Sequence, residues 1–148
     1  MEETRNSTAY CGLYCPDCNR SKAELFEQIG SLQQSLSVLN FDKYARYKAD
    51  LGSSEFGEYP TFLRVLNDIK ELACITCRDE RNSSPCKIRK CAIDKGLAGC
   101  WECESVSGCE LLAPMFKRHI GLAQNHHAIR EYGIDNWSGN RGKHYRWD

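Results

Sequence analysis

Residues 74–110, CITCRDERNSSPCKIRKCAIDKGLAGCWECESVSGCE, decide the fold because they carry seven of the ten cysteines in the chain. Cys74 and Cys77 form one C-x2-C pair, and Cys100 and Cys103 form another. Each such pair supplies two ligands of a tetrahedral metal site. The segment has little other apolar sequence from which a core is built. The pattern therefore predicts a protein organised around bound metal.

Three further cysteines lie near the N-terminus in a C-x3-C-x2-C pattern, the spacing by which radical SAM enzymes hold a [4Fe–4S] cluster. Those enzymes usually carry an aromatic residue before the third cysteine, where this chain has Asp17, and they need a long α/β barrel. No repeated βα pattern is present, so we do not expect such an enzyme, and no catalytic residue is assigned. All ten thiols are candidate metal ligands: Cys11, Cys15, Cys18, Cys74, Cys77, Cys86, Cys91, Cys100, Cys103 and Cys109.

Length, charge and the N-terminal sequence limit the class of protein. A chain of 148 residues fits one domain, and its formal net charge of zero does not favour nucleic acid as a partner. MEETRNSTAY has no apolar signal sequence, and no apolar run is long enough for a membrane span. We therefore expect a cytoplasmic protein that does not bind membranes. Its thiols would stay reduced there, which favours metal ligation over disulfides.

Apolar residues at helical spacing dominate the sequence before residue 74. Leu25, Ile29, Leu32, Leu36 and Leu39 alternate in steps of four and three, which predicts a core-packing helix. A capping box formed by Ser21 and Glu24 is expected to open it. The sequence predicts a second helix carrying Phe41, Tyr44, Tyr47 and Leu51 and ending near Gly52, then a third helix beginning at Pro60 and carrying Phe62, Leu66, Ile69 and Ala73.

Three more helices are expected after residue 74. Ser84 and Pro85 are the expected N-cap and first residue of a helix through Lys95. Ser107 and Glu110 form another capping box, opening a helix that Pro114 kinks. The sequence predicts a further helical stretch carrying Leu122, His126 and Ile129 up to Gly133, and a tail with at most a short helix near Trp137.

These patterns predict a mainly α fold with few or no strands, in which short helices surround a cysteine-rich metal-binding core. We expect one domain over residues 1–148. Its parts are a helical region at about 20–72, the metal-rich segment at about 74–110, and a C-terminal helix and tail at about 111–148.

Helix geometry suggests how the cysteines are divided. On one helix Cys86 and Cys91 would point about 140° apart, so we expect them to belong to different metal sites. The local partners of Cys91 complete one set of four: Cys91, Cys100, Cys103 and Cys109. The other set, Cys74, Cys77 and Cys86, then needs a fourth ligand from Cys11, Cys15 or Cys18.

Charged residues and histidines add little to this assignment. Basic residues near the cysteines, Arg78, Arg81, Lys87, Arg89, Lys90 and Lys95, are expected to offset the negative charge of a tetrathiolate site. His126 lies on an apolar helical face and is expected to be a core histidine. The other histidines, His119, His127 and His144, show no catalytic arrangement.

The chain resembles a family of small prokaryotic cysteine-rich domains of unknown function, DUF3795. The likeness rests on CGLYCPDC at 11–18, the C-x2-C at 74–77, CKIRKCA at 86–92, CWEC at 100–103, CEL at 109–111 and IREYGIDNW at 129–137. Family members often have another cysteine where this chain has Ser83. The resemblance implies zinc binding and no established activity.

Three functions remain open from the sequence. The first is a zinc-stabilised scaffold or interaction module with about two Zn2+ sites and a protein partner. The second is an iron–sulfur protein holding [4Fe–4S] for electron transfer or cluster carriage, although the usual ferredoxin cysteine run is absent. The third is a thiol redox or metallochaperone role for Cys15 and Cys18. An enzyme is not favoured, and the sequence does not define the oligomeric state.

Overall fold

The computed structural model describes residues 2–142 of the protein, and it is mainly α-helical. In that range the β pairing is limited to one isolated bridge between Thr8 and Tyr14. The prediction of a mainly α fold with few or no strands is therefore confirmed. None of the helices in this range is both long and apolar enough to cross a membrane. The expectation for His144 lies outside the described residues.

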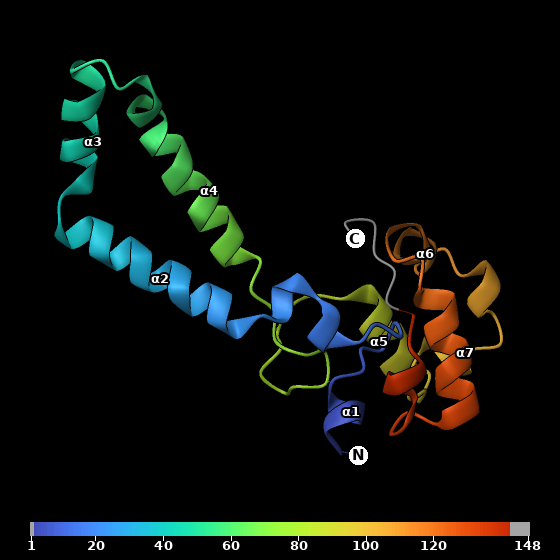
Figure 1. The fold of residues 1–148 in the computed structure, drawn as a ribbon. Coiled ribbons are helices and arrows are strands. Elements are labelled where there is room, and N and C mark those ends of the chain that lie inside the picture. Colours follow the sequence, from blue (N-terminus) through green and yellow to red (C-terminus); the bar gives the residue numbers. More distant parts are fainter. Residues whose placement is uncertain (1, 143–148) are drawn as a thin grey trace. The chain divides into compact units, whose positions relative to one another are not determined.

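The chain forms two compact units. The helical unit is Lys22–Cys74, and the cysteine unit consists of the residues up to Ser21 together with those from Ile75 onward. Figure 1 colours the helical unit from blue through green, and the cysteine unit occupies both ends of the colour scale. The helical unit is thus an uninterrupted segment, whereas the cysteine unit is assembled from two distant stretches.

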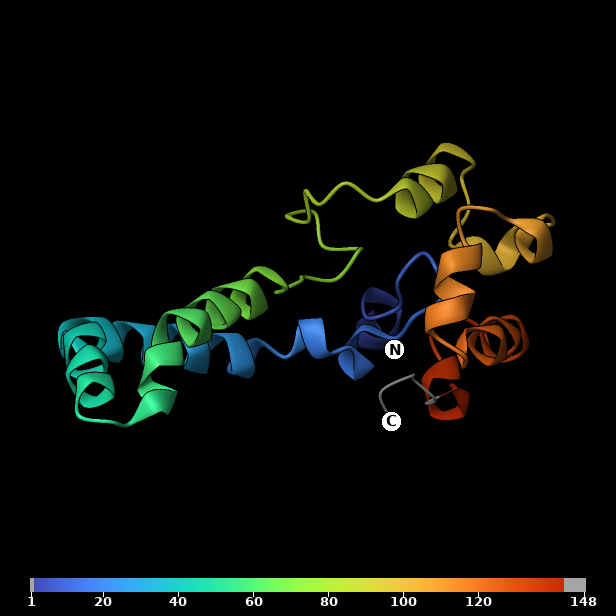
Figure 2. The same cartoon turned by 90° about the horizontal axis from the view of Figure 1, so that it is seen from above.

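Three helices make up most of the helical unit: α2 (Ala23–Val38), α3 (Phe41–Asp50) and α4 (Tyr59–Glu71). A 3-10 turn, η3 (Ser54–Glu58), joins α3 to α4. Asn40 has a φ of 50°, a left-handed conformation that asparagine tolerates better than most residues, and it separates α2 from α3. Both α3 and α4 contact α2, as Figures 1 and 2 show. The three helices occur where the sequence predicts them.

Two predicted details of α2 are wrong. The helix begins after Lys22, without a side-chain cap, because Ser21 ends a preceding 3-10 turn. The apolar seam is also only partly buried: Ile29 is 6% exposed, but Leu25 is 42% and Leu39 68% exposed. A three-helix unit without a further layer covers only the part of the seam that its neighbouring helices reach.

Aromatic rings connect α3, η3 and α4. The ring centroids of Phe41 and Tyr59 lie 5.5 Å apart, those of Phe41 and Tyr44 5.3 Å, and those of Tyr44 and Phe56 6.4 Å. Offset or edge-to-face pairs of this kind add to the stability gained from buried area. The aromatic residues therefore hold the end of the helical unit together.

The cysteine unit has a small apolar core around α7 (Leu122–Tyr132). Trp101, Ile129 and Trp137 are buried there, with Ala128 between them. The helix α7 contacts both short 3-10 turns that carry the tryptophans, η4 (Cys100–Glu102) and η6 (Trp137–Asn140). The remaining helices of this unit are α1 (Glu2–Asn6), α5 (Lys87–Asp94) and α6 (Ala113–Arg118).

The capping box predicted at Ser107 and Glu110 and the proline kink do not occur in this unit. Val106–Gly108 forms a 3-10 turn, η5, and Pro114 stands in the first turn of α6 instead of kinking a longer helix. Proline is favoured there because the first helical N–H groups have no partner to lose. The sequence pattern correctly predicts that α7 ends at Gly133, which has a φ of 75°.

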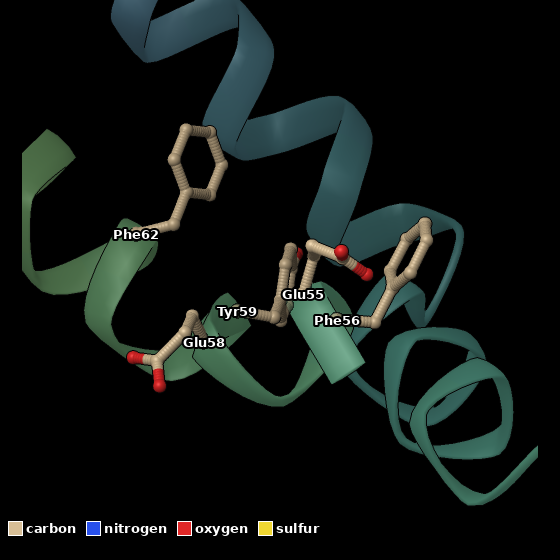
Figure 3. A pocket seen from close by; sticks show the side chains of 5 residues that line it. All are labelled: Glu55, Phe56, Glu58, Tyr59 and Phe62. Atoms are coloured by element: carbon tan, nitrogen blue, oxygen red, sulfur yellow. The ribbon is translucent and has the colours of Figure 1, made fainter. Parts of the chain in front are cut away.

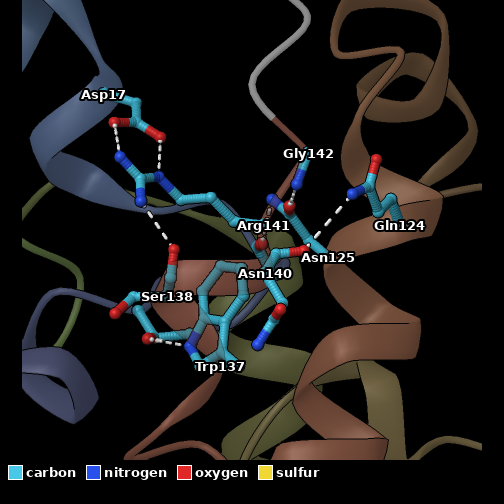
Figure 4. Close-up of polar contacts among 10 residues, drawn as sticks. Asp17, Gln124, Asn125, Trp137, Ser138, Asn140, Arg141 and Gly142 are labelled. Atoms are coloured by element: carbon cyan, nitrogen blue, oxygen red, sulfur yellow. Dashed lines mark hydrogen bonds and ion pairs between the residues drawn. The ribbon is translucent and has the colours of Figure 1, made fainter.

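Polar contacts tie the N-terminal stretch of the cysteine unit to its C-terminal stretch (Figure 4). The guanidinium of Arg141 pairs with Asp17, with Nη2 2.9 Å from Oδ1. The indole of Trp137 donates to Thr8 Oγ1 at 2.9 Å. Asn125 is 1% exposed, accepts from the amide of Gly142 at 2.7 Å and donates to the carbonyl of Gly12 at 2.9 Å. Buried polar groups are therefore satisfied by bonds that bring Cys11 and Cys15 to the rest of the unit.

Candidate metal centre

Nine of the ten cysteines belong to the cysteine unit. Cys74 is the exception, because it is the last residue of the helical unit. All ten thiols are free, so no disulfide takes any of them out of the set of candidate ligands.

Four cysteines line one small cavity of about 110 Å³. They are Cys91, Cys100, Cys103 and Cys109, the complete set that the sequence predicts for one metal site. The rest of the wall is mostly apolar and includes Leu97, Val106 and Leu112. A donor set of four thiols against an apolar wall is chemically suited to a soft metal.

Short turns position these four side chains. Cys91 lies within α5, whereas Cys100 begins η4 and Cys103 caps its end. The amide of Cys103 bonds to the carbonyl of Cys100 at 3.1 Å, which folds the C-x2-C pair into a single 3-10 turn. Cys109 caps the end of η5, the next turn along the chain. Two consecutive tight turns thus bring Cys100, Cys103 and Cys109 to the wall of the same cavity.

Burial and neighbouring thiols both disfavour the thiolate form of Cys100. Its pKa is raised to about 11, first by burial and then by Cys109, Cys91, Cys103 and Cys86. Like charges placed together raise each other's pKa, and a bound cation reverses that effect. The ammonium of Lys95 lies 3.9 Å from Cys103 Sγ and is the cationic group that the structure places against this set.

The structure changes the position assigned to Cys86. The helix α5 begins at Lys87 instead of Pro85, and Cys86 is its N-cap, with Sγ 3.5 Å from the amide of Arg89. The predicted N-cap, Ser84, is wrong. Cys86 and Cys91 therefore do not both lie within one helix, on which their predicted separation of about 140° depends. Instead, Cys86 lies in extended backbone ahead of the helix.

More cysteines lie in the apolar cluster around Leu112. Cys11 is buried there, and Cys15 and Cys77 pack against the same cluster, as do Cys100 and Cys109 from the cavity. Burial raises the pKa of Cys11 to about 12, opposed by the amide of Leu13 and reinforced by Cys77, Cys100 and Cys15. Cys77 therefore has thiol neighbours from the N-terminal stretch. Cys18 belongs to neither the cavity lining nor this cluster.

Arg78 has a structural role that the sequence pattern did not reveal. Its guanidinium donates to the carbonyls of Thr8 at 2.7 Å and Ala98 at 2.6 Å, and it lies 4.3 Å from the ring centre of Tyr10. Burial lowers its pKa. Arg78 thereby links three separate stretches of the unit next to Cys77.

Two other basic residues near the cysteines pair with carboxylates. Arg81 binds Asp79 at 2.7 Å, and Lys90 binds Asp94 at 2.8 Å. The expectation that these cations offset thiolate charge is therefore supported for Lys95 by a direct contact, whereas Arg81 and Lys90 have other partners.

The prediction of a core histidine is confirmed for His126. It is 4% exposed, and its Nε2 lies 2.8 Å from the carbonyl oxygen of Cys11. Burial lowers its pKa. His127, the next residue on α7, is exposed and pairs with Glu131 at 3.2 Å. Neither histidine is placed as a metal ligand.

The ligand side chains do not converge in this structure. Across residues 2–142, no three His, Cys, Asp or Glu side chains form a group arranged to hold a metal ion. The cavity and the apolar cluster bring thiols to the same regions of the unit without closing a coordination shell. The fit to a metal therefore rests on the kind and number of donor groups.

The fold and its thiols define a class, a small mainly α-helical protein rich in free cysteine. The chain belongs to the DUF3795 family, described as a protein of unknown function, whose model matches residues 7–114. Comparisons with curated proteins and with solved structures gave no match.

Proposed function

We propose that the protein binds Zn2+ and that the metal stabilises a scaffold or interaction module. The observation that carries this proposal is the single cavity lined by Cys91, Cys100, Cys103 and Cys109. Four thiolates around one zinc leave no coordination position for a substrate, so such a site supports structure instead of chemistry. Reduced thiols require a reducing compartment, which favours the cytoplasm.

The apolar wall of the cavity is a second reason to expect that the four thiols bind a metal ion. A thiol set held against apolar side chains is costly to ionise without a cation, as the raised pKa of Cys100 reflects. Zinc binding deprotonates its cysteine ligands and contributes its binding free energy to folding. A divalent soft metal is therefore the ligand that would stabilise the ionised form of these four thiols most.

Cys11, Cys15 and Cys77 support a second zinc site in the same unit, completed by one of the remaining cysteines. Cys15 and Cys77 pack against the apolar cluster that buries Cys11, a cluster that Cys100 and Cys109 also join. Cys77, Cys100 and Cys15 all raise the pKa of Cys11, and Cys100 already belongs to the cavity set. This proposal replaces the expectation that Cys86 is the nearest partner of Cys77. Two sites predict about two zinc ions per chain.

Metal analysis of protein purified under reducing, oxygen-free conditions tests the proposal. We expect zinc, no iron and no visible absorbance, and we expect Cys103→Ser to lose about one zinc per chain because one of four ligands is gone. Ser105→Ala is the matched control, since Ser105 lines the same cavity without being a thiol donor. Iron with brown colour would assign an iron–sulfur cluster instead, and equal zinc in both variants would exclude this cavity as a site.

A further inference from the structure

A second pocket, of about 200 Å³, opens on the helical unit at the start of α4. Three aromatic residues and two glutamates form its wall: Glu55, Phe56, Glu58, Tyr59 and Phe62 (Figure 3). None of these residues is a cysteine or a neighbour of one in sequence. The pocket is therefore independent of the proposed zinc sites.

The aromatic rings at the pocket form a connected group. The ring centroids of Tyr59 and Phe62 lie 6.1 Å apart, and Phe56 meets Tyr44 edge-on at 6.4 Å. Phe62 is 44% exposed and Tyr44 49% exposed, so part of this aromatic surface is open to a ligand. The face of an aromatic ring attracts organic cations within about 6 Å of its centre.

The pocket itself is lined almost entirely by apolar surface, and two exposed glutamates, Glu55 and Glu58, place negative charge at its rim. In the view of Figure 3, the carboxylate of Glu55 lies between the rings of Phe56 and Tyr59. Within residues 2–142 neither Glu55 nor Glu58 has a hydrogen-bond or ion-pair partner for its side chain, and Glu58 does not cap α4. Burial and the charge of Asp42 together raise the pKa of Tyr59, so a third carboxylate acts on this one ring. No lysine or arginine lines the pocket.

The surface beyond the pocket favours a peptide over a small cation. Val65 follows Phe62 by three residues on α4, which places both on one helical face, and Val65 is 49% exposed. Tyr44 extends the apolar surface onto α3. A small ammonium ion would cover only the pocket, whereas a peptide would also cover these neighbours. We infer that the pocket receives a lysine or arginine side chain from a segment of a protein partner, whose apolar residues pack against Tyr44 and Val65.

The test uses the full-length, metal-loaded protein and three synthetic heptapeptides. Each has glycine and serine around one central residue, which is lysine, arginine or glutamine, followed by one leucine. Titration is followed by amide chemical shifts in NMR spectra at low salt, because exposed charge pairs weaken as ionic strength rises. We expect the lysine and arginine peptides to shift the signals of Phe56, Tyr59 and Phe62, and the glutamine peptide to bind at least about fivefold more weakly.

Charge variants locate the binding. Glu55→Gln with Glu58→Gln should weaken the basic peptides by about fivefold or more, because both carboxylates at the pocket are lost. The matched control, Glu27→Gln with Glu71→Gln, makes the same change in net charge outside the pocket and should stay within about twofold of the natural protein. Should the double variant fail to fold, Glu55→Gln alone carries the test, since Glu55 is exposed on η3.

Three results would overturn the inference. Equal loss of binding in the test and control variants would show a general effect of net charge. Tetramethylammonium binding as tightly as the peptides would assign the pocket to a free organic cation. Concentration-dependent self-association that shifts the same signals without peptide would assign this surface to a second copy of the chain.

Discussion

Gly12 lies beneath a buried histidine ring, and its backbone has a φ of 93°. A side-chain carbon at this position would lie 2.5 Å from Cδ2 of His126. The left-handed conformation and the missing side chain are therefore both needed for His126 to reach the carbonyl of Cys11. This residue connects the CGLYC motif to α7 in a way that spacing alone does not reveal.

Gly12→Ala should lower the free energy of unfolding by roughly 2 to 4 kcal/mol, through backbone strain and overpacking against His126. Denaturant unfolding of the metal-loaded protein measures this change. Gly139→Ala is the control, because no atom lies within 4 Å of its added carbon and its φ is not positive. A loss of similar size in both variants would contradict the role assigned to Gly12.

Among the single elements, α2 shows that apolar periodicity predicts a helix without predicting which of its apolar residues are buried. Ile29 is buried, whereas Leu39, from the same apolar seam, is 68% exposed. Ile29→Ala should cost roughly 2 to 4 kcal/mol of stability because it leaves a cavity. Leu39→Ala should cost less than about 0.5 kcal/mol. Denaturant unfolding of both variants provides the comparison, and equal losses would mean that the whole seam is buried in solution.

The N-terminus of α5 separates two roles of Cys86. Serine is a good N-cap and alanine a poor one, so Cys86→Ser should be about 1 kcal/mol more stable than Cys86→Ala. Any contribution of Cys86 to metal binding is lost equally in both variants, so their difference isolates the cap. Unfolding measurements showing no difference would argue that the contact between Sγ and the amide of Arg89 does not stabilise the helix.

Which of the longer segments are helical was predictable from sequence, but several helix boundaries and the burial of individual side chains were not. The apolar spacing of residues 59–71 and 122–132 predicts α4 and α7 correctly because both helices carry long periodic faces. Capping motifs at Ser21 and Ser107 misplace helix starts, because these serines instead lie in or beside 3-10 turns. The helix α1 was not predicted, since its five residues show no apolar pattern.

In the candidate metal site, too, features set by neighbouring residues were predictable from sequence, whereas those set by distant contacts were not. The four cysteines that line the cavity are close in sequence, and local spacing alone picks out the same four, while their sharing of one metal ion stays a prediction. The proximity of Cys11 and Cys15 to Cys77 depends on contacts across most of the chain, including those of Arg78 and Asn125. The count of ligands predicted that Cys77 needs a partner from Cys11, Cys15 or Cys18, but no spacing pattern shows which of them lie near it, and the fold places Cys11 and Cys15 there.

At the scale of the whole molecule, the two units should respond differently to metal removal. Nine thiols lie in the cysteine unit, whose apolar cores are small. Chelation under reducing conditions should lower amide protection there by at least about tenfold, for instance in α7, because bound metal contributes folding free energy. Amides of α2 and α4 should change much less. Hydrogen exchange measures both, and an equal change in both units would contradict a stabilising role confined to the cysteine unit.

The split of the cysteine unit around residues 22–74 has a consequence for biosynthesis. A ribosome delivers Cys11 and Cys15 well before Cys77 and Cys100, and the whole helical unit emerges in the interval. That unit is contiguous and rich in local contacts, so it is able to fold while the first thiols wait without their partners. The early thiols are therefore exposed to oxidants and competing metals in the nascent chain, and protection comes only when residues beyond 100 have been made.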